Sequence, residues 1–232
     1  TPRAASCHNG ASFDRFLAGL RQRAASEGVS QQTLAEAAPY LVFNQGIVNR
    51  DRGQRVFGQL FTQFAGRMAA PDRMQQGQQR IKTYAAAFAR AEKEYGVPPA
   101  VIAAFWGLES DFGSNMGNLP TLPSLVSLAY DCRRSEYFTD QLYAALKLVD
   151  RGVLSASTQG SMHGEIGQTQ FLPKNILAYG TGNLDNSANA LNSTANFLKA
   201  HGWRAGAGYQ PGEPNYAAIQ ARSEEHTSEL QS

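Results

Sequence analysis

The sequence has few cysteines, no long apolar run and no excess of one charge. Its 232 residues include 2 cysteines, 21 lysines and arginines, and 19 aspartates and glutamates, which gives a formal net charge of +2. No window reaches the roughly 20 consecutive apolar residues of a membrane-spanning helix. The balanced, scattered charge argues against a dedicated nucleic-acid binder. Hydrophobic residues make up 42% of the chain, so we expect a globular protein with a substantial core.

The two cysteines, Cys7 and Cys132, lie too far apart in sequence for a zinc or redox motif. A disulfide between them would tie the N-terminal arm to the core, as is common in exported proteins. The alternatives are two buried thiols, or a lipid on Cys7, which follows "AAS". We favour the disulfide. The first residues, "TPRAASCHNG", lack the apolar run of a signal peptide, so we expect any leader to be absent from this sequence.

Apolar residues recur with helical spacing over most of the chain. Proline opens several of these stretches and glycine closes others, as is typical of helix ends. Gly96 ends one helix, and the "VPP" that follows forces a corner. We predict helices, in chain order, at 12–27, 56–68, from Pro71 to 95, from Pro98 to about 111, 121–130, 135–150, from Pro173, and 187–200.

The stretch "STQGSMHGEIGQTQF" breaks this helical pattern. It combines three glycines with serine, threonine and glutamine, which is typical of an irregular loop or short strands. The predicted fold class is therefore mainly α: a helical bundle with a small irregular or β subregion around residues 153–171.

Glu109 is the first candidate for chemistry, in the stretch "AAFWGLESDFGSNMG". On a helix it shares one face with Val101, Phe105, Leu108 and Phe112. Apolar surroundings disfavour an ionised carboxylate, so this acid can hold a proton for donation. The glycines that follow end the helix and place the acid beside a loop, where functional residues concentrate. A structural glutamate paired with an arginine, or capping a backbone turn, is the alternative at this point.

The stretch "GSMHGEIGQTQF" is the second candidate. Ser161, Gln168 and Gln170 offer neutral donors and acceptors that suit sugar hydroxyls or N-acetyl groups. Glu165 is a rival carboxylate, which we interpret as a solvent-facing loop acid. His163 could be a base or a ligand, but it has no partner at metal-ligand spacing.

Three stretches in this order resemble the lytic murein transglycosylases of the B type: "FWGLESDFGSNMGNLPTLPSLVSLAYDCRRSEYF", "GSMHGEIGQTQFLP" and "LNSTANFLKAHGW". The similarity covers residues 10–221. It implies a lysozyme-like fold and non-hydrolytic cleavage of the β-1,4 bond between N-acetylmuramic acid and N-acetylglucosamine in peptidoglycan. It also implies that Glu109 first protonates the glycosidic oxygen and then accepts the proton of the muramic 6-hydroxyl, which leaves an anhydromuropeptide. Ordinary glycosidases use two carboxylates instead.

The same resemblance assigns the surroundings of the acid. Ser161 and Gln170 match a serine and a glutamine that line the site, and Ser110 stands where relatives have serine or threonine. With Gln168, these residues form the predicted substrate-binding set. The resemblance further implies peptidoglycan glycan strands as partner, no cofactor, a monomer, and the periplasm or cell envelope as location. The helix end at Gly96 and the corner after it mark the clearest internal boundary, so we expect an N-terminal helical part at 1–96, which wraps the core, and a lysozyme-like catalytic core at 97–221.

Two departures from the family pattern stand out. Many relatives have a calcium-binding-type loop after the second stretch. Here it is shortened to "YGTGNLDNS" and lacks the Asp-x-Asp-x-Asp-Gly pattern, so we predict no metal site. The last stretch, residues 222–232, "RSEEHTSELQS", is polar and looks like a translated sequencing adapter. We expect it to be a non-native tail that replaces the family's final helix, which would leave the cleft incomplete.

Two other functions fit parts of the sequence. A hydrolytic muramidase would act on the same bond and leave a reducing end. A catalytically silent peptidoglycan-binding module would share the fold, but it needs no protonatable acid among apolar residues. Glu109 therefore argues against the silent module, and a single acid fits a lytic transglycosylase better than a glycosidase with two carboxylates.

Overall fold

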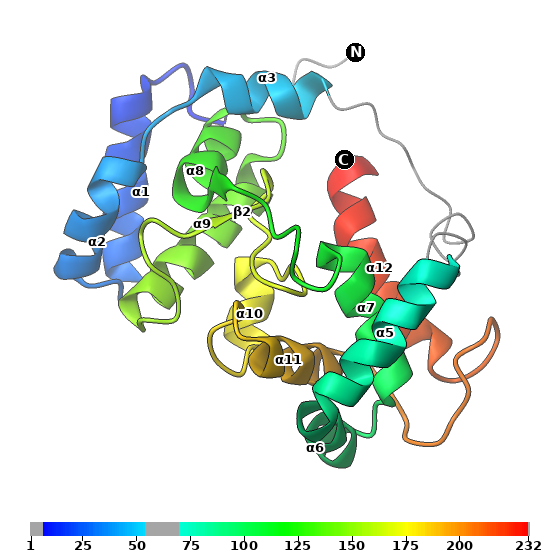
Figure 1. The fold of residues 1–232 in the computed structure, drawn as a ribbon. Helices are drawn as coiled ribbons and strands as arrows, with labels where there is room; N and C mark the ends of the chain where they lie inside the picture. Colours follow the sequence, from blue (N-terminus) through cyan, green and yellow to red (C-terminus); the bar gives the residue numbers. More distant parts are fainter. Residues whose placement is uncertain (1–6, 54–69, 232) are drawn as a thin grey trace. The chain divides into compact units, whose positions relative to one another are not determined.

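The fold is seen in a computed structural model that describes residues 7–53 and 70–231, with the backbone alone at 224–231. The predicted helix at 56–68 lies outside these residues. The described helices and strands are α1 Phe13–Ser26, α2 Gln31–Ala37, the 3-10 turn η1 Ala38–Tyr40, α3 Gln45–Gly53, α5 Pro71–Thr83, α6 Ala85–Tyr95, α7 Pro99–Ser110, β1 Leu119–Pro120, α8 Thr121–Tyr130, α9 Ser135–Asp150, β2 Gln159–Gly160, α10 Pro173–Tyr179, α11 Ser187–Ala200 and α12 Tyr216–Gln231 (Figure 1). The mainly α class is confirmed. None of the described helices is long and apolar enough to span a membrane.

The chain divides into two compact units, each built from separate stretches. The first unit comprises Thr1–Arg55, Gly117–Ile166 and Phe171–Leu177, and the second comprises Val56–Met116, Gly167–Gln170 and Ala178–Ser232. Both units take residues from each side of residue 96. The glycine-rich segment around 160–170 contributes to both units.

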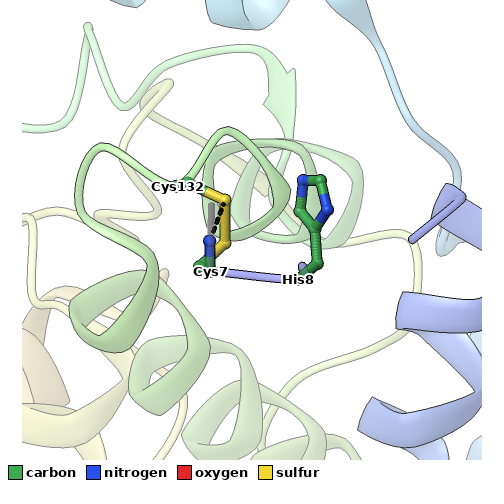
Figure 2. Close-up of side chains that lie close together, drawn as sticks. All are labelled: Cys7, His8 and Cys132. Atoms are coloured by element: carbon green, nitrogen blue, oxygen red, sulfur yellow. Dashed lines mark hydrogen bonds between the residues drawn. A yellow bond between two sulfur atoms is a disulfide. The ribbon is translucent and has the colours of Figure 1, made fainter. Parts of the chain in front are cut away.

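The first unit has its core between α1, α2, α8 and α9. Ser12 caps α1, because its hydroxyl accepts a hydrogen bond from the Arg15 amide. The predicted disulfide is confirmed: Cys7 and Cys132 are bonded, with Cα atoms 5.2 Å apart. It fastens the residues before α1 to the end of α8 (Figure 2).

A two-residue antiparallel ribbon supports the glycine-rich loop of the first unit. Leu119 pairs with Gly160, and Pro120 pairs with Gln159. Gly160 has to be glycine here, since a Cβ atom would lie 2.1 Å from the Glu165 carbonyl oxygen. The ribbon confirms the small β subregion predicted around 153–171.

The second unit shows two helices where the sequence predicted one from Pro71 to residue 95. Tyr84 interrupts the helix with φ −106° and ψ 30°, and its ring packs edge-on against Trp106 at 5.3 Å. The break allows α5 to pack on α7 while α6 packs on α11 (Figure 1). Gly96, with φ 72°, ends α6 as predicted.

Helix α12 continues through the point where the composition changes. Arg222, on this helix, is fully buried and donates hydrogen bonds to the carbonyl oxygens of Thr169 and Gln170. Its guanidinium lies 5.6 Å from the centre of the Phe197 ring. The change from apolar to polar residues at 222 therefore does not end the helix.

Candidate active site

The candidate acid lies at the end of an apolar helix. Pro99 opens α7, and the helix buries Val101, Phe105 and Trp106. Glu109 occupies the last turn and is half-buried. The predicted apolar face is therefore present, but the acid lies at its margin, where solvent and a ligand can reach it.

Three successive residues in the left-handed region turn the chain out of α7. Asp111, Phe112 and Gly113 have φ values of 47°, 58° and 91°. Non-glycine residues rarely adopt this conformation, and it persists only where surrounding contacts hold it. The turn directly after Glu109 is therefore a constrained structure.

Contacts from α5 hold this turn. Arg73 forms a 2.8 Å ion pair with Asp111, and the Arg80 guanidinium lies over the rings of Trp106 and Phe112 at 5.7 and 5.8 Å. Gly107 makes room for the Phe112 ring, since a Cβ atom there would come within 2.8 Å of it.

The structure brings Ser110 and Gln168 together. Ser110 is 1% exposed, and its hydroxyl donates to the Gln168 carbonyl oxygen and accepts from the Gly113 amide at 2.9 Å. The Trp106 indole donates to Gln168 Oε1 at 2.8 Å. Ser110 therefore lies on the last turn of α7 and Gln168 lies against it, with the polar groups of both side chains bonded inside the protein.

Gln170 is oriented by its own amide. It is 5% exposed, with φ 53°, and its Nε2 donates to the carbonyl oxygens of Met116 and Gly167 at 3.1 and 2.8 Å. Among the described residues, no hydrogen bond to its Oε1 is found. The side-chain oxygen of Gln170 is therefore the group that it can offer to a ligand.

Ser161 belongs to the first unit, whereas Glu109 belongs to the second. The Ser161 hydroxyl accepts a hydrogen bond from the Glu165 amide at 3.0 Å, and the Ser161 amide donates to the Glu165 carbonyl at 2.9 Å. These bonds close the loop that carries both residues. Glu165 is half-buried.

Sequence reasoning missed a charged cluster around a buried aspartate in the first unit, which we call the Asp51 cluster: Asp51, Arg133, Arg134 and His163. Asp51 is 4% exposed. It contacts His163 Nε2 at 2.8 Å and Arg134 at 2.9 Å, and it also pairs with Arg133. His163 is therefore part of an ion-pair network. The adjacent arginines were the visible signal, but their partner lies about 80 residues earlier in the chain.

Charge decides how Asp51 titrates. Burial alone raises the pKa of Asp51, but the hydrogen bond with His163 and the charges of Arg133 and Arg134 outweigh it. The pKa of Asp51 is consequently lowered from its usual value.

One group of described residues has the composition of a metal site. The donor atoms of Cys7, His8 and Cys132 lie within 4.8 Å of one another (Figure 2). Both sulfurs are joined in the disulfide, and the His8 ring stacks on Tyr130 with centroids 4.2 Å apart. A disulfide sulfur is not the thiolate that binds metals, so this group does not fit a metal ion in the oxidised protein.

The mainly α fold carries a glutamate on the last turn of an apolar helix. Residues 12–231 match the family described as Transglycosylase SLT domain, and the chain is a member of that family.

Among its relatives is membrane-bound lytic murein transglycosylase B of Escherichia coli K12. The two are 35% identical over 161 residues, which is 62% of this chain and 45% of that protein. A solved structure of SltB3 from Pseudomonas aeruginosa, in complex with NAG-anhNAM-pentapeptide, is similar with a TM-score of 0.77 and 36% identity, over 85% of this chain and 55% of that one. Escherichia coli Slt35 in complex with calcium gives a TM-score of 0.72 at 26% identity, over 89% and 70%. The chain thus spans about half the length of the first two relatives.

Proposed function

We propose that this chain cleaves the β-1,4 bond between N-acetylmuramic acid and N-acetylglucosamine in peptidoglycan without using water as the nucleophile. The observation that carries the proposal is Glu109, a half-buried acid on the last turn of α7, in a chain that matches the transglycosylase family over residues 12–231. The relative SltB3 is seen with NAG-anhNAM-pentapeptide and with NAG-NAM-pentapeptide. These names support a sugar-peptide ligand, and the first supports an anhydro product.

In this mechanism Glu109 does both proton transfers. It protonates the glycosidic oxygen as the bond to the anomeric carbon breaks. The resulting carboxylate then accepts the proton of the muramic 6-hydroxyl, whose oxygen forms the new bond to the anomeric carbon. Atoms balance without water or a cofactor, and proton transfer of this kind contributes about 10²–10⁴-fold to rate.

The predicted substrate-binding residues divide by their own local geometry. We propose that Gln170 and Ser161 contact the glycan, since Gln170 has its side-chain oxygen available and Ser161 is half-buried in a glycine-rich loop. Ser110 is buried with its hydroxyl already bonded, so its role in this proposal is to hold the helix end. Peptidoglycan strands as partner, a monomeric state and a place in the cell envelope belong to the same proposal.

The test is digestion of purified sacculi with mass spectrometry of the released fragments. We expect anhydromuropeptides from the unsubstituted chain and a loss of about 10²-fold or more in Glu109→Gln. Glu165→Gln, which changes the rival carboxylate, is the matched control and should retain activity.

Three outcomes would contradict the proposal in different ways. Reducing-end products would show a hydrolytic muramidase. Binding without release of fragments would show a silent module, and activity lost only in Glu165→Gln would move the acid to the other unit.

A further inference from the structure

Gln168 uses all its polar groups within the second unit. Its amide donates to the Leu184 carbonyl at 3.0 Å, its carbonyl accepts from Ser110, and its Oε1 accepts from the Trp106 indole at 2.8 Å. Its Nε2 donates to the Asp185 carbonyl at 2.7 Å and to the Ser187 hydroxyl at 3.0 Å. A glutamine amide has two donor protons and one acceptor oxygen, so both ends of this side chain are engaged.

These bonds hold the last turn of α7 at two points. Trp106 and Ser110 are four residues apart, so they lie on one face of the helix. Glu109 lies between them in sequence, on the same turn, so its Cα–Cβ direction is set by the backbone of that turn. Holding Trp106 and Ser110 against Gln168 therefore fixes the direction in which the Glu109 side chain leaves the helix.

The other end of Gln168 holds the turn at residues 183–187. That turn is ordered by its own bonds, since the Asp185 amide donates to Asn183 Oδ1 at 2.9 Å. It also lies close to the Gly167 backbone, where an added Cβ atom would be 2.6 Å from the Leu184 Cβ. Gln168 thus joins the end of α7 to a turn more than 70 residues further along the chain.

We call Trp106, Ser110, Gln168, Asp185 and Ser187 the Gln168 junction, and we propose that Gln168 is a positioning residue that sets the orientation of Glu109. The inference rests on the proposed role of Glu109 as the acid. It replaces the expectation that the Gln168 side chain binds sugar, because such a contact would have to break bonds that the side chain already makes. A misplacement of about 1 Å can cost about 10²-fold in rate, so a residue of this kind acts on turnover rather than on substrate affinity.

Gln168→Met tests the proposal, since methionine is similar in volume and lacks the amide. Turnover is measured on sacculi, and the indole N–H groups are followed by ¹⁵N NMR. The chain has 2 tryptophans, and the Trp203 indole donates to the Gly96 carbonyl at 2.9 Å, away from the junction. Trp203 is therefore an internal reference, assigned by the peak that Trp203→Phe removes.

We expect Gln168→Met to shift the Trp106 peak and leave the Trp203 peak in place. We expect kcat to fall by about tenfold or more, with KM changed by less than about twofold. Gln168→Glu keeps an oxygen for Trp106 and removes the donors to Asp185 and Ser187, so its Trp106 peak should stay near the original position while kcat falls.

Gln141→Met is the matched control. Gln141 is also a buried glutamine, 3% exposed, and its Oε1 accepts from the Lys174 amide at 3.0 Å in the first unit. Its substitution removes a buried amide without touching the junction, so kcat should be retained. If Gln168→Met does not fold, Ser187→Ala removes a single acceptor and should still lower kcat at constant KM.

Two results would overturn the inference. A rise in KM at constant kcat would make Gln168 a substrate ligand, and an unchanged kcat with a shifted Trp106 peak would show that the junction does not orient the acid. Glu109→Gln, measured alongside, separates the two proposals. If it keeps full turnover, the proposed function fails; if it is inactive while Gln168→Met keeps kcat, only the role of Gln168 fails.

Discussion

The glycine-rich segment at 160–170 is held at two points by different chemistry. In the first unit, His163 lies in the charged Asp51 cluster, beside a carboxylate that is 4% exposed. In the second unit, Gln168 is held by neutral hydrogen bonds. Burying a charge costs more desolvation free energy than burying a neutral amide, and a charged carboxylate responds to pH whereas an amide does not. The two halves of one segment should therefore respond differently to substitution, acid and salt.

The largest loss of stability is expected from disrupting the Asp51 cluster. Asp51→Ala removes the carboxylate that pairs with Arg134, whose side chain is 5% exposed. Removing one member of a buried pair typically lowers the free energy of unfolding by about 3–5 kcal/mol, which denaturant unfolding measures. Arg133→Ala is the control, because that side chain is 41% exposed and should cost only about 0–1 kcal/mol. Equal losses in the two variants would contradict the distinction.

Gly113→Ala should disturb the neutral hydrogen bonds around Gln168. Gly113 has φ 91°, and an added Cβ would lie 2.6 Å from Gln168 Oε1. We expect a loss of about 2–4 kcal/mol, from left-handed strain together with the clash. Gly202→Ala isolates the strain, because Gly202 has φ 96° and nothing within 4 Å of the added atom. If the two substitutions lower the free energy of unfolding equally, the clash with Gln168 does not contribute to the loss of stability.

Lowering the pH should reduce the stabilisation by the Asp51 cluster and leave the neutral hydrogen bonds of Gln168 unaffected. The pKa of Asp51 is lower in the folded than in the unfolded chain, so its contribution is complete above about pH 5 and is lost as pH falls through the folded-state value. Asp51→Asn should therefore flatten the decline of Tm at the acid end. Gln168→Met should lower Tm by a similar amount at every pH. If the Tm of Asp51→Asn and the Tm of the unsubstituted chain fall in parallel as the pH is lowered, Asp51 does not make this contribution.

The smallest effect is expected from removing metal. The turn at 183–187 is tied by Gln168 Nε2, and the sequence there lacks the calcium-loop pattern. Since only a ligand that binds the folded state raises Tm, EDTA should leave Tm and turnover unchanged. A fall in Tm that calcium restores would reveal a cation at this turn.

Local patterns predicted the parts of the structure that depend on near neighbours. Gly96 and Pro99 mark helix ends whatever surrounds them, because glycine readily adopts the left-handed conformation after a helix and proline, with its fixed φ and no N–H, fits the first helical turn. Tyr84 breaks a helix that periodicity made continuous, because packing of its ring on Trp106 outweighs local propensity.

The candidate site was likewise predictable only where it depends on residues close together in the sequence. Glu109 was found from its neighbours on one helix face, and its place on the last turn of α7 follows from the glycines after it. The partners of Gln168 lie between 16 and 62 residues away in sequence, and no single-sequence pattern links such positions. The charged surroundings of His163 were missed for the same reason.

The disulfide has a consequence for how this chain matures. With two cysteines in the sequence, only one pairing exists within a molecule, so no scrambled isomer can form. Cys7 is made long before Cys132, which follows 125 residues later, and its thiol has to wait for its partner. At high protein concentration, cysteines of two molecules can instead form an intermolecular disulfide. The resulting covalent dimer runs at twice the monomer mass on a non-reducing gel. Slow oxidation at low protein concentration avoids it.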